Sequence, residues 1–399
     1  MSQTVTDNLA KFYTSGMDNF VTEQAYLAGL TFEDLMALAQ TTLLQGVMEA
    51  EELLDIGGNN SVSLGTAVAP VAAGSATGGG LSDGSYTIAV VALTYDGMIR
   101  ATVSGGVPLP YTRANMDGST DSIQGFCGKY SAVSNTVTLN AGTAVQSLTA
   151  TVTAVTGAFG YAWYAGTGAQ STLTLAAVTG YPAVTIKTIG GTQTIANLPS
   201  TDTSTNALEY NGLLTQIVTS GSGAYVTDLA GQPLTTAGSG SGGLTEINTA
   251  LQSFFTNYRL IPTDIFMSAT DQRAAAALIL TGNTNLAPFF MGASAEEGLM
   301  GSTTFKRYVN PIGFGNPELE VHAHPFIPPG TIIFYSRTNP YPLSNVPNLV
   351  QKTLRRDYWS VEWPVVTLQR TMGVYFDGVL QMYFPPAFGV ITGVRASGT

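Results

Sequence analysis

Three residues of the sequence have the chemistry of metal ligands: Glu320, His322 and His324. They alternate along a strand-like segment, and alternate side chains of a strand share one face. One ion could then contact all three, but no fourth ligand is evident, and histidines on an exposed strand face are ordinary. The triplet is therefore a weak candidate for a metal site. These are the only 2 histidines, which leaves little general-base capacity near neutral pH.

Other motifs with enzymatic chemistry are weaker. Gly238–Gly243 has the spacing G-x-G-x-x-G but lacks the flanking strand and acid of a dinucleotide site, so we expect a flexible loop and no cofactor. Cys127 has no histidine in its part of the chain, which favours a small buried side chain over a nucleophile. Glu296 and Glu297 could suit a hydrolase, but adjacent strand residues point to opposite faces. The sequence predicts that the protein is not an enzyme.

Two charged clusters of opposite sign stand out. The acidic cluster comprises Glu49, Glu51, Glu52 and Asp55. It crowds the end of a predicted helix, where the helix dipole disfavours negative charge. The basic cluster comprises Lys352, Arg355 and Arg356, followed by Tyr358 and Trp359. The acids are either a solvated face or the partner of a basic surface. We predict that the clusters contact each other, within or between subunits, and take both, with Trp359, as candidate interface residues.

The composition favours an assembly subunit. Only 10% of the 399 residues are charged, against roughly a quarter in an ordinary soluble domain. A surface so poor in charge is better suited to contact with neighbouring copies than to a freely diffusing monomer. The net charge of −11 argues against nucleic-acid affinity through bulk charge. No signal-peptide pattern and no apolar run of about 18 residues is present, so we expect a soluble product made in a cytoplasm.

One long helix is predicted from residue 31 to residue 56. Thr31 is the expected N-cap, with Asp34 as its capping-box partner, and Gly57-Gly58 ends the helix. An apolar stripe at helical spacing marks the face that packs inward. The stripe consists of Phe32, Leu35, Met36, Ala39, Leu43, Val47, Ala50 and Leu54.

From residue 61 to residue 205 the sequence predicts an all-β domain. Short β-branched or aromatic runs are separated by glycine-rich or Asp96-Gly97 turns, as in an antiparallel sandwich. The expected strands are 85–93, 136–139, 148–155, 160–164, 173–178 and 184–189. Alternation predicts the inward-facing set Tyr86, Ile88, Val90, Leu148, Val152, Tyr161 and Trp163.

The last part, 206–399, has a mixed pattern. Residues 219–243 are rich in Gly and Ser and predict a mobile loop. Helical stripes follow from Leu244 to Phe255 and from Ser268 to Leu280, with a buried strand, Ile265–Met267, between them. Further strands are predicted at 318–324, 331–335, 361–370 and 373–383.

Three segments resemble the major capsid proteins of tailed phages. They are Leu53–Gly57 at the helix end, Tyr210–Ile217, and Leu260–Ser268 after a helix. The resemblance covers 1–60 and 206–399. It implies an α+β fold of the Hong Kong 97 type, with a spine helix and peripheral and axial domains, interrupted by an all-β sandwich. Segments 85–93 and 157–164 look like an inserted immunoglobulin- or fibronectin-type domain.

The resemblance implies an amino-terminal arm and extended loop in 1–30, a spine helix in 31–60, the insertion in 61–205 and the capsid core in 206–399. Within that core, 244–280 would belong to the helical face of the peripheral domain. It further implies a virion capsid, assembled in the host cytoplasm from hexamers and pentamers of this chain around double-stranded DNA. Expected partners are portal and scaffold proteins, a decoration protein, and DNA through non-specific lumen contacts, with no membrane. The alternative is a phage tail or surface adhesion protein whose β domain binds glycans.

Overall fold

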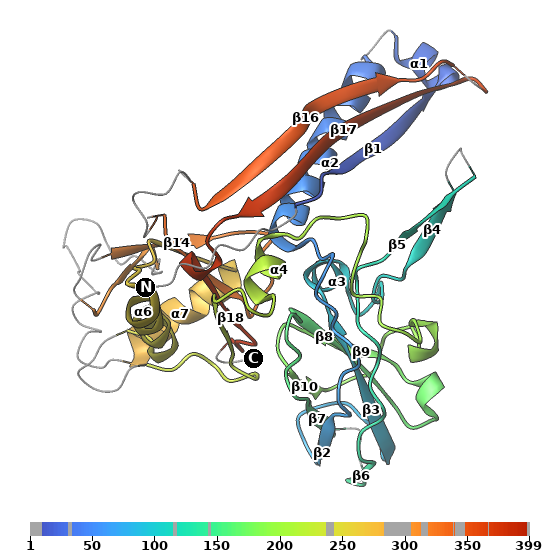
Figure 1. The fold of residues 1–399 in the computed structure, drawn as a ribbon. Helices are drawn as coiled ribbons and strands as arrows, with labels where there is room; N and C mark the ends of the chain where they lie inside the picture. The colour runs from blue at the N-terminus through green and yellow to red at the C-terminus, as the bar shows by residue number, and fades with distance from the viewer. Residues whose placement is uncertain are drawn as a thin grey trace, which may run out of the picture.

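The computed structural model describes residues 10–30, 34–114, 118–142, 145–236, 243–282, 305–312, 318–337, 339, 348–365 and 367–396. The chain is a mixed α+β protein with several separate sheets (Figure 1). Three parts can be distinguished: a projecting arm, a β insertion and a body built on a six-stranded sheet. Within the described ranges, no helix has the length and apolar character of a membrane span.

The arm joins the two ends of the chain. Strands β1 (Tyr13–Thr22), β17 (Gln369–Met382) and β16 (Val350–Glu362) form an antiparallel sheet in that order. Helix α2 (Leu35–Gly57) lies along one face of this sheet, and the short helix α1 (Glu23–Gly29) sits near the far end (Figure 1). The buried core between α2 and the sheet is small and comprises Leu43, Val47, Met372, Val374 and Phe376.

Helix α2 begins later than the sequence suggested. Asp34, not Thr31, is the N-cap, because its Oδ1 accepts hydrogen bonds from the amides of Met36 (3.1 Å) and Ala37 (3.2 Å). Thr31 and Phe32 lie outside the described residues. The predicted end is confirmed: Gly57 is the last helical residue and the Gly58 amide donates to the Leu54 carbonyl (2.9 Å).

Replacing Asp34 by alanine should therefore lower the free energy of unfolding by about 1 kcal/mol, the usual cost of losing an N-cap side chain. Asparagine retains the capping oxygen, so Asp34→Asn should stay close to the original stability. Urea unfolding followed by circular dichroism would measure both. Equal losses in the two variants would contradict this assignment of the cap.

The insertion contains two sheets around a shared core. One has the order β6 (Val137–Leu139), β3 (Gly84–Leu93), β8 (Gly160–Gly166), β9 (Thr174–Thr179). The other has the order β10 (Ala183–Ile186), β7 (Ser147–Thr151), β2 (Val71–Ser75). All seven residues predicted to face inward are buried. The opposite face of β3 and β8 is also buried, against a second cluster that includes Cys127, Leu173 and Ile195.

Other elements of the insertion differ from expectation. Asp96-Gly97, expected to form a turn, lies in helix α3 (Tyr95–Arg100), which Thr94 caps. Strands β4 (Tyr111–Ala114) and β5 (Thr120–Ile123) form a separate hairpin, and short 3-10 turns occur at Gln170–Thr172 and Ile195–Asn197. The α3 helix is favoured because Tyr95 is buried and its hydroxyl donates to the Phe326 carbonyl of the body (2.7 Å).

The chain enters and leaves the insertion side by side. The Asn60 amide donates to Asn211 Oδ1 (2.8 Å), and the Gly212 amide donates to the Gly58 carbonyl (2.8 Å). A Cβ at Gly212 would lie 2.6 Å from the Leu54 carbonyl oxygen, so only glycine allows this close approach. Adjacent ends of this kind are what a domain inserted into a loop requires.

The body contains the largest core. Its mixed sheet has the order β11 (Tyr225–Asp228), β18 (Phe388–Thr392), β15 (Ile332–Tyr335), β12 (Asp264–Met267), β14 (Glu318–Ala323), β13 (Arg307–Val309). Helices α4 (Leu213–Val218), α6 (Thr245–Tyr258) and α7 (Ala269–Gly282) and a 3-10 turn at Pro385–Ala387 complete it. Helices α6 and α7 therefore pack on the six-stranded sheet of the body, whereas α2 packs on the sheet of the arm (Figure 1).

Two predictions for this part were wrong. The loop predicted over 219–243 contains strand β11, whose Tyr225 packs on Phe254. The strand predicted over 361–370 spans the turn of the β16–β17 hairpin, where Thr367 and Leu368 have positive φ. The turn was missed because its residues are β-branched and apolar, which locally favours a strand.

Candidate functional site

The acidic end of helix α2 lies against strand β16 of the same chain. Lys352 Nζ is 2.8 and 3.0 Å from the two carboxylate oxygens of Asp55, and it also forms an ion pair with Glu51. The Tyr210 hydroxyl donates to Asp55 Oδ1 (2.5 Å), which ties the same carboxylate to the segment that leaves the insertion. Burial raises the pKa of Tyr210, and the charge of Asp55 raises it further. The predicted contact between the clusters is thus present at Lys352, within one subunit.

The other basic residues do not join this contact. Arg355 Nε pairs with Asp377 Oδ2 (2.7 Å) on the neighbouring strand, and the Arg356 guanidinium stacks on the Trp359 ring at 4.3 Å. The prediction was therefore wrong for Arg355 and Arg356. Alternation along β16 places Arg355 on the face opposite to Lys352, and one extra residue between Leu354 and Arg356 turns Arg356 to that face as well. A second irregularity, between Arg356 and Trp359, reverses the shift, and the Tyr358 hydroxyl donates to Glu51 of α2.

The acidic cluster also divides. Glu52 Oε1 is 3.0 Å from His324 Nε2 of the body, so this pair links the arm to the end of strand β14. Glu49 is exposed, and within the described ranges no basic side chain lies in ion-pair distance of it. Of the predicted acidic interface residues, Glu51, Glu52 and Asp55 therefore form ion pairs within the chain, whereas Glu49 does not.

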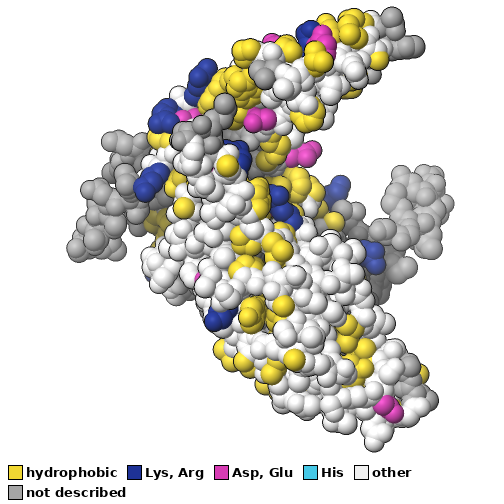
Figure 2. Space-filling view, turned by 90° about the vertical axis from the view of Figure 1, so that its right-hand side faces the viewer, with side chains coloured by type: hydrophobic (Ala, Val, Ile, Leu, Met, Phe, Trp, Pro, Cys, Tyr) yellow, Lys and Arg dark blue, Asp and Glu magenta, His cyan; other side chains and the backbone are white. Residues whose placement is uncertain are grey.

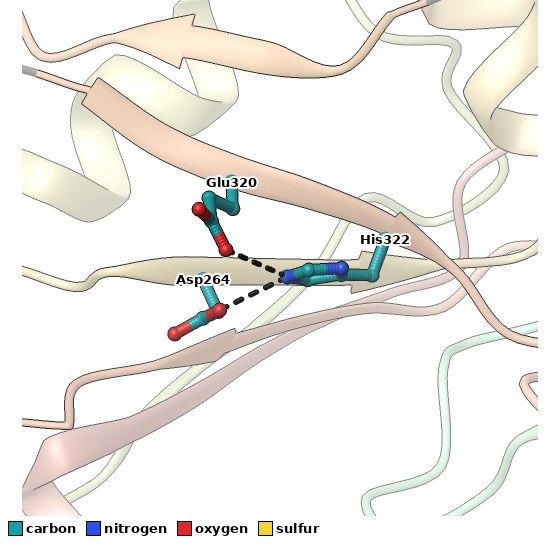
Figure 3. A group of neighbouring side chains, drawn as sticks. All are labelled: Asp264, Glu320 and His322. Carbon is teal, nitrogen blue, oxygen red and sulfur yellow. Dashed lines mark hydrogen bonds and ion pairs between the residues drawn. The ribbon is translucent and has the colours of Figure 1, made fainter.

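The predicted metal triplet is replaced by a different group. His322 Nε2 lies 3.0 Å from Asp264 Oδ1 and 3.6 Å from Glu320 Oε2, and Figure 3 shows the three side chains converging from β12 and β14. His324 is not part of this group, because β14 ends at Ala323 and His324 turns toward Glu52. Sequence analysis missed Asp264, which the parallel pairing of β12 with β14 places beside Glu320.

A guanidinium already occupies this carboxylate group. Arg337 Nη2 donates to Asp264 Oδ1 (2.5 Å) and lies 3.6 Å from Glu320 Oε2. Burial raises the pKa of the Asp264 carboxyl, but hydrogen bonds from Thr263, Arg337 and His322 outweigh it and hold that pKa below its usual value. The donor atoms could suit a metal ion. Because the positive charge is supplied by Arg337, we interpret the group as an ion-pair network that ties β12, β14 and the end of β15 together.

A cavity of about 160 Å³ lies where the arm meets the insertion and the segment that leaves it. Its lining includes Glu51 of α2, Asp96 and Arg100 of α3, and Glu209. Burial and then the charge of Asp96 raise the pKa of Glu209 to about 7. Burial also raises the pKa of Asp96, although Arg100 pairs with it at 2.7 Å. The junction thus holds carboxyl groups that resist ionisation.

The remaining motifs carry no site. Cys127 is buried, as predicted, and burial raises the pKa of its thiol to about 11, which suppresses nucleophilic reactivity. Gly238–Gly242 lie outside the described residues, as do Glu296 and Glu297.

Exposed apolar side chains concentrate on the arm. Of the twenty-three large hydrophobic side chains that are exposed among the described residues, thirteen belong to it or to its ends. They are Phe12, Met17, Phe20, Leu27, Leu30, Leu38, Leu44, Met48, Leu354, Tyr358, Trp363, Val365 and Leu368. Figure 2 shows hydrophobic side chains gathered on the arm at the top of the view. In addition, α2 has no charged residue from Leu35 to Met48.

The arm thus projects from the rest of the protein and exposes many apolar side chains. Exposed apolar surface of this kind is suited to contact with another protein rather than with a small molecule. No protein-family model matches the chain, and no curated protein matches its sequence.

Proposed function

We propose that this chain is the major subunit of a shell that assembles from identical copies, of the kind that tailed-phage capsid proteins form. The observation that carries the proposal is the arm. Its buried core comprises five side chains, whereas thirteen large apolar side chains on it are exposed. Monomeric soluble proteins rarely leave apolar surface of this extent uncovered, so contact with other copies would stabilise the arm.

Two further features support the proposal. The ends of the insertion are hydrogen-bonded side by side, so the domain could be displayed from a shell subunit without disturbing the rest of the chain. The polar groups that could suggest catalysis, around Asp264 and around Lys352, are engaged in ion pairs that join elements of the fold. Ion pairs that join elements of the fold suit a structural role, whereas acid–base catalysis would need a side chain that is free to exchange a proton.

In detail, α2 would be the spine helix of a Hong Kong 97-type subunit and 61–205 its immunoglobulin-like insertion. Residues 206–399 would form its peripheral and axial domains, with the amino-terminal arm and extended loop in 1–30. The copies would form hexamers and pentamers around double-stranded DNA, with portal, scaffold and decoration proteins as partners. Contacts to the packaged DNA would be non-specific.

Assembly of the purified protein tests this function. We expect rings or closed particles by negative-stain microscopy and concentration-dependent large species by sedimentation velocity. Introducing charge into the arm by Leu38→Glu together with Met48→Glu should shift the protein to monomers. Val309→Glu is a matched control, because Val309 is 70% exposed but lies on the body. Monodisperse wild-type monomers at high concentration, with or without a scaffold protein, would contradict the proposal.

A further inference from the structure

We infer that neighbouring copies stack their arms side by side, with the outer side of α2 in one copy on an aromatic surface of the next, so that the contact runs in one direction around a ring. This inference rests on the proposed self-assembly and specifies its geometry. It follows from two surfaces on opposite sides of the same arm: an exposed helix face, and an aromatic surface on which Trp363 is 36% exposed while Trp359 and Tyr375 are half-buried.

The first surface is the helix face, the side of α2 turned away from its sheet. Leu43 and Val47 are buried against the sheet, so residues half a turn away point outward. Leu38 is 47% exposed and Met48 is 51% exposed. The face between them carries no charge, and it consists of Leu38, Thr41, Thr42, Gln45 and Met48.

The second surface is the aromatic platform, formed by Trp359, Tyr375 and Trp363 on the other side of the sheet. Val374 and Phe376 point to the helix, so Tyr375 between them points away from it. Its ring centroid lies 5.9 Å from that of Trp359 and 6.4 Å from that of Trp363.

Two glycines let the Tyr375 ring of the platform lie close to the backbone of the sheet. A Cβ at Gly16 would overlap Tyr375 Cδ1, and a Cβ at Gly373 would be 2.7 Å from Tyr375 Cε2. The Tyr375 ring therefore rests on backbone rather than on neighbouring side chains. The Trp359 ring is inclined by 30° to the Tyr375 ring, and the Trp363 ring stands edge-on to it at 78°. Aromatic side chains have few rotatable bonds, so such a surface binds apolar partners with little loss of side-chain entropy.

The placement of the two surfaces decides the symmetry. A two-fold contact buries the same patch of both copies, so it would cover the helix face or the platform and leave the other exposed. A heterologous contact places the helix face of each copy on the platform of the next and covers both. Such contacts close into a ring when the rotation between copies permits.

The charges beside the two surfaces fit parallel arms. Glu49 follows Met48 on the side of the helix face nearer the body, and Arg356 precedes Trp359 on the same side of the platform. In the described part of the chain, neither side chain has an ion-pair partner, and Arg356 is held only by its stacking on Trp359. Burial raises the pKa of the Tyr375 hydroxyl, whereas Arg113 of the β4–β5 hairpin lies close enough for its positive charge to lower that pKa. Arms that point the same way would bring Glu49 of one copy to Arg356 of the next.

Site-directed cross-linking tests the direction of the contact. Thr41→Cys places a thiol on the helix face, and Val361→Cys places one beside the platform, opposite Gly373. The native Cys127 is buried and should not react. After treatment with a short bismaleimide, the double variant should give a ladder of covalent oligomers larger than dimers. Each single variant should stay monomeric, and a mixture of the two should stop at dimers.

Other outcomes separate this inference from the proposed function. Dimers from Thr41→Cys alone would show that the helix faces of two copies meet across a two-fold axis. Particles that form without any cross-link in the double variant would show that other surfaces hold the copies together. Either result would overturn the ring contact but would leave the proposed self-assembly intact. Absence of any assembly would contradict both proposals. Quenching of tryptophan fluorescence in unassembled protein by cellohexaose would assign the platform to a sugar instead.

A charge exchange provides an independent measurement. Glu49→Arg and Arg356→Glu should each raise the concentration needed for assembly about fivefold, the effect of losing about 1 kcal/mol per contact. Combining the two substitutions should restore assembly close to the original concentration. Additive losses in the combined variant would contradict the pairing of these residues.

Discussion

Replacing Lys352 by methionine is expected to lower the free energy of unfolding by about 3–5 kcal/mol, because it leaves a buried carboxylate without its counter-charge. Glu51 has a side chain only 9% exposed, and Lys352 is its cationic partner and that of Asp55. Methionine keeps most of the volume of lysine, so the loss reports charge rather than packing. Urea unfolding of unassembled protein at neutral pH would measure it.

Two comparisons make this result specific. Arg307→Met removes an exposed ion pair with Glu318, whose side chains are 67% and 48% exposed, and should cost at most about 1 kcal/mol. Adding Glu51→Gln to Lys352→Met should recover part of the loss, since the uncompensated charge is then removed. A small loss in Lys352→Met, equal to that in Arg307→Met, would show that the contact is solvated and weak.

Replacing Glu209 by glutamine is expected to stabilise the protein at pH 8 but not at pH 4. Burial and the charge of Asp96 raise the pKa of Glu209 from 4.5 to about 7. The folded protein therefore prefers neutral Glu209: its stabilising effect is complete below pH 4.5 and is lost as the pH rises through 7. At 1.36 kcal/mol per pKa unit, the gain of the variant should level off near about 3 kcal/mol above pH 7.

The difference between wild type and variant isolates this group. Asp96 titrates in the same direction but is present in both proteins, and Arg100 offsets part of its charge. Glutamine can still accept the hydrogen bond from Asn206 Nδ2, which is 2.8 Å from Glu209 Oε1. Glu318→Gln, at an exposed carboxylate, is the control and should show no comparable rise. A difference that does not change between pH 4 and pH 8 would refute the assignment.

The insertion could be predicted from the sequence because its information is local. Alternating apolar residues in β3 and β8 identified an inward face that is buried in the structure, including Trp163 and Ile88. The burial of the opposite face could not be predicted in the same way. It depends on segments such as the one around Ile195, which lie far away in the sequence.

The arm was the least predictable part. Strand β1 contains Gly16, Asp18 and Asn19, which are poor strand formers, and it exists because it pairs with β17 at the other end of the chain. The exposed surface of the arm was suggested only indirectly, by the scarcity of charge. Which side of the sheet carries the aromatic platform required the structure.

By itself, the sequence determined where the long helix ends, the mainly β character of 61–205 and the scarcity of charge, because each depends on residue types and short-range periodicity. Tertiary structure decided which groups meet. Lys352 faces the acidic helix end, and one extra residue between Leu354 and Arg356 turns Arg356 to the platform side of the sheet. The pairing of β12 with β14 brings Asp264 to His322. Strand register is set by contacts between distant segments, and a shift of one residue reverses the face of every side chain that follows.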